Sequence, residues 1–274
     1  MFTINCKGKI WVVDKPLVMG IINATPDSFY KGNIDEDMLQ LATTMIEDGA
    51  CILDIGGQST RPGSIRISAA EETNRVLPVI RAIHQAFPET IISIDTYSSE
   101  VAKAAVDAGA AMVNDISGGN MDNRMLQTVA ALQVPYVCMH MQGTPENMQQ
   151  EPEYNNVVTE VLDFCIAKIA QCREAGIKDI IIDPGFGFGK TIAHNFSLLK
   201  QLQAFAILDV PVLAGLSRKS TVYKTLGTTA EEALNGTTVL NTMALINGAS
   251  ILRVHDVKAA AEAIALFMAY KKAP

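Results

Sequence analysis

Side chains able to bind ligands or move protons stand at or near the end of almost every short apolar run in this chain. They are acids, amides, hydroxyls, imidazoles and cations in eight successive runs: Asn23, Asp54, Asp95, Asn114, Asp115, His140, Asp183, Ser217, Arg218, Lys219, Arg253, His255 and Asp256. Such groups hold polar heterocycles, stabilise anions and transfer protons. Because the pattern repeats at the same end of each run, we predict that all eight runs point at one shared site. That arrangement indicates an enzyme.

Two carboxylates and an amide follow the third, fourth and sixth runs. Asp95, Asn114 and Asp183 suit an aromatic heterocycle with adjacent hydrogen-bond donors and acceptors, although carboxylates also bind metals or exchange protons. No His or Cys stands at zincin-like spacing, so we do not expect a tight transition-metal cage. A single acid would equally be a structural cap, but three such groups at equivalent positions favour a ligand. For His140, after the fifth run, a site and a core position are equally good interpretations.

Three segments carry groups suited to anions. Residues 56–63 (GGQSTRPG) follow a strand and contain the forked donor Arg61 among small residues and hydroxyls. Residues 217–220 (SRKS) lead from the seventh strand into a helix, whose start favours a carboxylate or a phosphate. Arg253 and His255 are two residues apart, so they share one side of the last strand. The alternatives are a plain turn, a solvated basic cap and a core histidine.

The glycine-rich segment at residues 183–191 (DPGFGFGKT) is not a nucleotide fingerprint. The P-loop pattern requires glycine where Pro184 stands, and the G-x-G-x-x-G spacing is absent. Alternating glycines after a strand still predict that the backbone approaches a ligand closely; the alternative is a flexible loop. At the end of the first strand, the amide oxygen of Asn23 is a candidate Mg²⁺ ligand, because Mg²⁺ commonly takes few protein ligands and keeps waters or phosphates.

Composition limits the class of protein. The 274 residues are 49% hydrophobic with a formal charge of −7, which argues against nucleic acid as the main partner. The five cysteines are odd in number and lack C-x-x-C spacing, so we expect reduced thiols. We find neither the pattern of a signal peptide nor an uncharged apolar run of about 18 residues, and therefore expect a cytoplasmic protein without a membrane partner.

The elements that would position these residues alternate as strand and helix. Residues 3–18 alternate around Lys7-Gly8 and predict a β-hairpin, after which helices end on a glycine and the next strand starts at once. The opposite connections are long and rich in Gly, Pro, Ser and Asn. Tight αβ turns with long βα loops are typical of a (β/α)8 TIM barrel, with an open doubly wound sheet as the competitor. We predict one α/β domain over residues 1–274, with the hairpin in 1–17 and the barrel in 18–274.

Seven of these segments together resemble the dihydropteroate synthases. They are residues 23–29 (NATPDSF), 56–63, 95–96 (DT), 114–118 (NDISG), 183–190, 217–220 and 253–256 (RVHD), in the family's order from about Val18 to Val257. The resemblance implies a TIM barrel of the folate pathway. Such enzymes join 6-hydroxymethyl-7,8-dihydropterin diphosphate to p-aminobenzoate, giving 7,8-dihydropteroate and pyrophosphate.

The resemblance also implies a role for individual residues. The pterin would contact Asp95, Asn114, Asp183, Lys219 and Arg253. The diphosphate would contact Asn23, Thr60, Arg61, Arg253 and His255, with Mg²⁺ as cofactor and Asn23 as its protein ligand. The p-aminobenzoate would contact Phe29, Pro62, Phe188, Lys219 and Ser220. Catalysis would rest on Asp95, Lys219, Arg253 and His255, in a dissociative reaction: the C–O bond breaks first and the amine then attacks.

Some points remain open at this stage. Gln58 replaces a frequent Glu, and YKGN at residues 30–33, with Lys31, replaces the more typical SDGG, which puts loop order and metal affinity in doubt. The rival interpretations are a pterin-binding methyltransferase that acts with a corrinoid partner, and a non-catalytic pterin-binding regulator. The family implies a homodimer formed through barrel helices, and the apolar late helix at residues 259–268 is compatible with one. Sulfonamide sensitivity is a further family expectation.

Overall fold

A hairpin precedes the main sheet, as predicted. The computed structural model describes residues 2–25, 34–59, 63–148 and 150–274. Strands β1 (Phe2–Cys6) and β2 (Lys9–Val13) pair antiparallel, with Phe2 opposite Val13 and Cys6 opposite Lys9. Lys7 and Gly8 between them both have positive φ, 52° and 86°, which matches the right-handed twist of the two strands.

Eight parallel strands form the barrel. They are β3 (Leu17–Asn23), β4 (Ile52–Gly56), β5 (Ile91–Asp95), β6 (Met112–Asp115), β7 (Tyr136–Met139), β8 (Ile180–Asp183), β9 (Leu213–Ala214) and β10 (Ile251–Val254). Each pairs with its neighbour in the order β8-β7-β6-β5-β4-β3-β10-β9. The ring closes where Ile182 bridges Val212 and its N–H donates to the Pro211 carbonyl at 2.9 Å. The closed barrel is therefore confirmed, and the open sheet is wrong.

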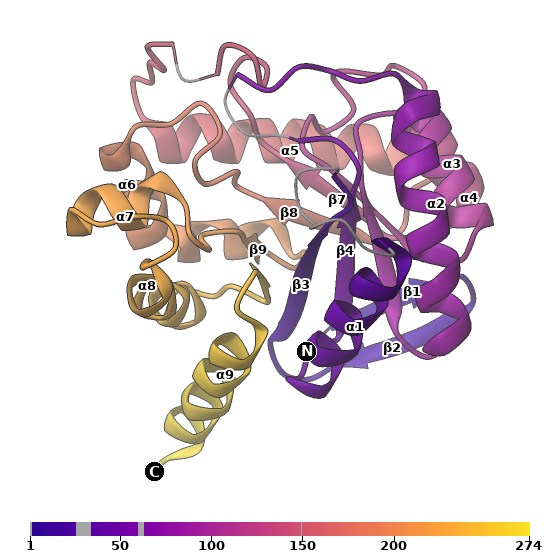
Figure 1. Ribbon diagram of the computed structural model, residues 1–274. Coiled ribbons are helices and arrows are strands. Elements are labelled where there is room, and N and C mark those ends of the chain that lie inside the picture. Colours follow the sequence, from indigo (N-terminus) through magenta and orange to yellow (C-terminus); the bar gives the residue numbers. More distant parts are fainter. Residues whose placement is uncertain (1, 26–33, 60–62, 149) are drawn as a thin grey trace.

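Helices surround the strands (Figure 1). They are α1 (Ile34–Glu47), α2 (Ala69–Ala86), α3 (Ser99–Asp107), α4 (Met125–Leu132), α5 (Val157–Ala175), α6 (Ile192–Lys200), the 3-10 helix η2 (Leu202–Leu208), α7 (Ser220–Leu226), α8 (Leu234–Ile246) and α9 (Val257–Lys272). The predicted glycine endings are present: Gly49, Gly109, Gly176 and Gly248 all have positive φ, and a strand follows within a few residues. In the described part of the chain, no helix is long and apolar enough to cross a membrane.

The amino-terminal end of the barrel is filled by an apolar layer. One buried side chain or more from every barrel strand lies in it, and the hairpin adds Ile4, Cys6 and Val13 from below. The barrel members are Leu17, Met19, Ile52, Ile91, Met112, Val137, Ile181, Leu213 and Ile251. Each is below 9% exposed. The hairpin thus closes the end of the barrel opposite to the polar strand ends.

Candidate active site

Four residues form a buried ionic network at the carboxyl ends of the strands. Arg253, on β10, donates from Nε to Asp54 Oδ2 and from a terminal nitrogen to Asp95 Oδ2, both at 2.6 Å. Asn114 donates from Nδ2 to the same oxygen of Asp54 at 2.9 Å. Asp54, Asp95 and Asn114 are all below 9% exposed. Residues 60 to 199 positions apart in the chain are thereby brought together around one guanidinium.

This network leaves acceptors open. Among the described side chains, Oδ1 of Asp54 and Oδ1 of Asp95 are buried without a hydrogen-bond partner. Burial raises the pKa of Asp95 to about 7, although Arg253 opposes the shift. Burial alone would lower the pKa of Arg253, but Asp54 and Asp95 outweigh it and raise that pKa. A buried carboxylate oxygen without a donor is costly, so these two oxygens are able to accept further N–H donors.

Asp54 was predicted to stand in one of the eight runs that point at the site, but no contact or catalytic role was assigned to it. It stands inside the apolar run of β4, one alternation before Gly56, and is fully buried. The signal was present in the sequence, because a carboxylate in a buried strand must face the barrel interior when its neighbours pack against helices. Its partner Arg253 follows 199 residues later. That pairing is not visible in the local sequence.

Asp183 and Lys219 form a second part of the same mouth. Asp183 Oδ1 accepts from the Gly185 N–H at 2.7 Å. The Lys219 ammonium donates to the Phe186 carbonyl and lies 4.7 Å from the centre of the Phe188 ring. Burial lowers the pKa of Lys219 to about 8, opposed by Asp183, and burial raises the pKa of Asp183, opposed by Lys219. The Asp183 carboxylate and the Lys219 ammonium therefore interact electrostatically, each favouring the charged form of the other.

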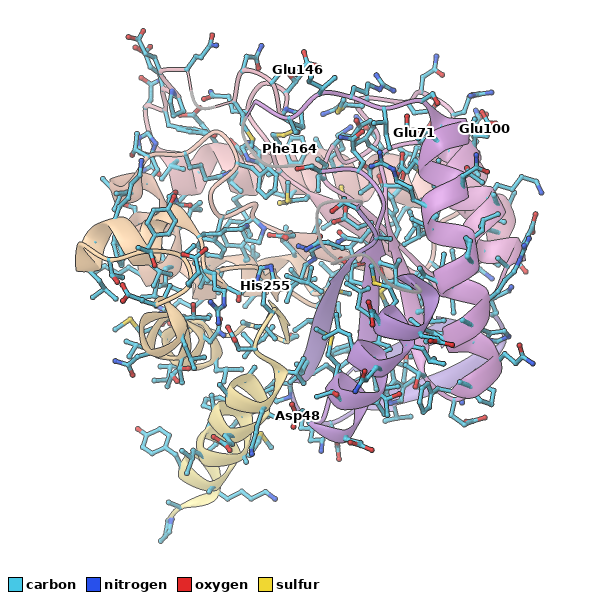
Figure 2. All side chains as sticks on the ribbon, in the orientation of Figure 1. Asp48, Glu71, Glu100, Glu146, Phe164 and His255 are labelled. Carbon is cyan, nitrogen blue, oxygen red and sulfur yellow. The ribbon has the colours of Figure 1, made fainter. Side chains whose placement is uncertain are left out.

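His255 lies at the end of β10, where Figure 2 labels it. Its backbone N–H donates to Ser217 Oγ at 3.2 Å, and that hydroxyl is 3.1 Å from His255 Nδ1. The hydroxyl therefore donates to a neutral ring. Surrounding protein and then the charge of Arg253 lower the pKa of His255 to about 4. The residue as a whole is exposed to solvent, so an anion can approach it.

Arg218 does not serve as a free cation at this mouth. It bonds Asp256 through two nitrogens, each at 2.8 Å, and also donates to the carbonyls of Ala230 and Glu231. The expectation of two cations available to an anion in residues 217–220 is therefore corrected to one, Lys219. Ser220 begins α7 beside it and is half-buried.

The buried acid Asp115, at the end of β6, holds the loop that follows this strand. Asp115 accepts from the Ser117 N–H, the Ser117 hydroxyl, the Gly119 N–H and the Tyr136 hydroxyl, all at 2.7–2.8 Å. Its side chain points out of the barrel while that of Asn114 points in, since neighbouring strand residues face opposite ways. The NDISG segment thus combines one ligand position with the anchor of its own loop.

Four predicted contacts lie outside the described residues: Phe29, Thr60, Arg61 and Pro62. Lys31 lies outside them as well. Gln58, at the edge of this gap, is buried and its amide is fully used. It donates to the carbonyls of Ser59 and Ile65 at 2.8 and 3.1 Å and accepts from the Ile67 N–H at 2.8 Å. The amide that replaces the usual acid therefore ties the β4–α2 connection together.

The donor set fits Mg²⁺ only as a metal carried by a substrate. Asn23 ends β3 with its side chain exposed at the mouth. Among the residues that the structure describes, no group of three or more His, Cys, Asp or Glu could hold a metal ion. Mg²⁺ that keeps waters and substrate phosphates needs no more than one or two protein oxygens.

Comparisons with known proteins agree with this geometry. The family described as "Pterin binding enzyme" matches residues 19–255. The dihydropteroate synthase of Escherichia coli K12 is 44% identical over 254 residues, 91% of this chain and 89% of that protein. A Xanthomonas albilineans dihydropteroate synthase solved with 4-aminobenzoic acid has a TM-score of 0.93 at 41% identity, covering 99% of both chains. A second structure from that organism, in complex with 7,8-dihydropteroate, has a TM-score of 0.90 at 39% identity, covering 99% of this chain and 100% of the other.

The matched span includes every barrel strand except the first two residues of β3. The sequence identity of 44% over 254 residues is far above what a shared fold alone requires. The methyltransferase interpretation is thereby set aside. The chain belongs to the pterin-binding enzyme family and, within it, to the dihydropteroate synthases, the transferases of folate biosynthesis that join a pterin to p-aminobenzoate.

Proposed function

We propose that the buried network at the barrel mouth holds the pterin substrate. Asp95, Asn114, Asp183 and Lys219 supply acceptors and donors for its ring, and Arg253 stacks on its face. The observation that carries the proposal is the pair of buried, unpartnered oxygens on Asp54 and Asp95 beside the Arg253 guanidinium. A planar ring with several N–H groups satisfies both oxygens at once.

The diphosphate of that substrate lies further out, at the rim. His255 and Arg253 provide donors there, and Asn23 provides an amide oxygen. By family resemblance Thr60 and Arg61 join them. Asn23 would hold Mg²⁺, which would supply positive charge to offset the charge that develops on the leaving group.

The reaction is dissociative in this proposal. The bond between the pterin methylene and the diphosphate oxygen breaks with its electron pair on oxygen, where Arg253 and His255 stabilise the charge. The pterin carries the positive charge, and Asp95 in its ionised form faces it. The amine nitrogen then bonds the methylene, and the proton that it loses passes to the released pyrophosphate or to water. Lys219 and Phe188, in contact at 4.7 Å, frame the arylamine ring together with Phe29 and Pro62, and Ser220 at the start of α7 binds its carboxylate.

The test separates bond cleavage from amine attack. The enzyme is incubated with the pterin diphosphate and Mg²⁺ alone, and pyrophosphate is measured; p-aminobenzoate is then added and dihydropteroate measured. We expect pyrophosphate before the amine arrives. Strict dependence of its release on the amine would overturn the dissociative order. Lys103→Met, an exposed substitution on α3, is the matched control for Lys219→Met, which we expect to lose turnover.

We also propose a homodimer through α8 and α9. A groove of about 730 Å³ between these helices is lined by Leu234, Ile246, Leu266, Phe267 and Tyr270 among others. Leu266 is 73% exposed and Tyr270 75%, an apolar patch that a second copy would cover. Sedimentation of Leu266→Lys against Leu226→Lys, an equally polarising change on α7 at 58% exposure, tests it. We expect only the first to give monomers; two dimeric variants would contradict the proposal.

Two further proposals concern the domain organisation and the cellular location of the protein. Residues 1–274 form one domain, because Ile4, Cys6 and Val13 of the hairpin pack into the apolar layer of the barrel. The location is cytoplasmic, where the five free cysteines would stay reduced. A single cooperative unfolding transition checks the first, and cell fractionation with thiol labelling checks the second.

A further inference from the structure

A lysine is buried beneath the loop that joins β8 to α6. Lys190 is 3% exposed, and its ammonium has an acceptor for each of its three protons. It donates to the Gly185 carbonyl at 2.9 Å, to the Phe188 carbonyl at 3.0 Å and to His140 Nδ1 at 2.9 Å. The loop therefore folds back onto the lysine that ends it.

When Lys190 is protonated, His140 Nδ1 must act as the acceptor in this contact. Burial and then the neighbouring Lys190 lower the pKa of His140 to about 3, so its ring is neutral. The ring packs edge-on against Phe164 of α5, the residue labelled in Figure 2, with ring centres 4.8 Å apart. The backbone N–H of His140 donates to the Asp183 carbonyl at 3.0 Å, which fixes β7 to β8 at the point where the loop leaves.

The loop has little freedom to reposition itself. Gly185 has φ of 72°, and a Cβ there would lie 1.8 Å from the His140 carbonyl oxygen. On the outer side of the same loop, the Phe186 carbonyl accepts from Lys219 and the Phe188 ring lies beside that ammonium. Burial lowers the pKa of Lys190 to about 7, opposed by Asp183. Hydrogen bonds from this amine, rather than a permanent charge, thus hold the inner side of the loop, while Lys219 contacts its outer side.

We propose that Lys190 and His140 form a clasp that positions Phe188 and Lys219 for p-aminobenzoate. Lys190 and His140 are thus positioning residues for the second substrate. The inference rests on the roles proposed above for Phe188 and Lys219. Of the proposed pterin contacts, Asp95 and Asn114 come from other strands, and only Asp183 and Lys219 adjoin the clasp. The clasp therefore acts more on the affinity for the amine than on that for the pterin diphosphate.

The experiment compares KM and kcat for the two substrates in Lys190→Met and in the matched control Lys200→Met, an exposed lysine at the end of α6. We expect KM for p-aminobenzoate to rise about tenfold in Lys190→Met, the scale of one lost buried hydrogen bond. The dissociation constant of the pterin diphosphate should rise by a smaller factor than the KM for p-aminobenzoate, because Asp95 and Asn114 are untouched. An unchanged KM for p-aminobenzoate overturns the clasp.

A second pair covers the case in which Lys190→Met does not fold. His140→Gln keeps an acceptor for the ammonium, whereas His140→Leu keeps only bulk. The clasp predicts a lower KM for p-aminobenzoate in the Gln variant; a purely packing role for His140 predicts the reverse order, and that order overturns the clasp. Phe188→Ala tests the foundation: if it leaves this KM unchanged, the proposed subsite fails, and if it raises KM while the clasp variants do not, the clasp alone fails.

Discussion

The two ends of the barrel are built from the same strands and differ by one step of the strand period. At the amino-terminal end Ile52, Met112, Ile181 and Ile251 face inward as a dry layer. Two residues later, roughly 6.6 Å further along each strand, the inward positions read Asp54, Asn114, Asp183 and Arg253.

The comparison shows how one scaffold separates stability from chemistry. The apolar end gains free energy from burial and is closed by the hairpin. The polar end buries several charges, which is favourable only while each keeps a partner. Among the described side chains, one oxygen of Asp54 and one of Asp95 are buried without a hydrogen-bond partner, so this end is not fully satisfied by the protein itself. Substitutions at the polar end should therefore mainly lower catalytic activity, whereas substitutions at the apolar end should mainly lower the free energy of unfolding.

Arg253→Met should have the largest effect. It removes the cation that pairs with both Asp54 and Asp95 and the donor proposed for the diphosphate. We expect kcat/KM to fall about 10³-fold or more, or about 4 kcal/mol of transition-state stabilisation. Arg124→Met, at 71% side-chain exposure, serves as the control in steady-state assays. Activity within tenfold of the parent would refute the role of Arg253.

Ile181→Ala tests the opposite end. Its side chain is 1% exposed in the apolar layer, so we expect a loss of about 3 kcal/mol in the free energy of unfolding. The turnover number at 25 °C should be unchanged, because Asp183 lies one alternation above it. Urea denaturation measures the first and a saturated assay the second. Ile207→Ala, at 77% exposure, should change neither; a parallel loss of kcat in Ile181→Ala would show that the two ends are not separable.

The pH dependence comes from the polar end alone. The Asp95 pKa is raised to about 7 and that of Lys219 is lowered to about 8. If Asp95 acts as an anion and Lys219 as a cation, kcat/KM for the pterin diphosphate rises with pH through 7 and falls above 8, by about tenfold per pH unit on each limb. Asp95→Asn should remove the acid limb; a profile flat from pH 5.5 to 7 in the parent enzyme would sink this assignment.

The same shift has a consequence for stability, with its own sign. The folded pKa of Asp95 lies above its ordinary value of 3.8, so its contribution to the free energy of unfolding is complete below that value and is lost as the pH rises through about 7. Comparing the parent with Asp95→Asn by urea denaturation at pH 5 and 8 should show the larger pH dependence in the parent.

Much of the fold was predictable because local signals agree with one another. Apolar runs, glycine helix endings and long loops at one side specify a barrel without any long-range information. The closure between β8 and β9 was not predictable in detail. The seventh strand was predicted from its apolar run, but the closure depends on one bridge, Ile182 to Val212, beside a strand of only two residues.

The site was predictable where a residue ends a strand and not where its role depends on a distant partner. Asp95, Asn114 and Asp183 were found by position alone. Asp54 was given no role because its partner Arg253 is 199 residues away. Arg218 was taken for a free cation because Asp256 pairs with it from another strand end. Lys190 is part of the glycine-rich motif identified in the sequence, but its contact with His140, 50 residues away, is made only in the folded loop.

Val13→Ala should have the smallest effect and sharpen the account of the apolar end. Val13 is 2% exposed and belongs to the layer inside the barrel, whereas Val12 beside it on β2 is 57% exposed and faces away. Removing two methyl groups at position 13 should lower the free energy of unfolding by about 1–2 kcal/mol, and at position 12 by less than about 0.5 kcal/mol, with kcat unchanged in both. Urea denaturation of the two variants side by side makes the measurement. Since the two residues share one strand, any difference in β propensity cancels, and only packing against the barrel remains. Equal effects would mean that the hairpin merely lies beside the barrel, and the closed apolar end would then belong to the eight strands alone.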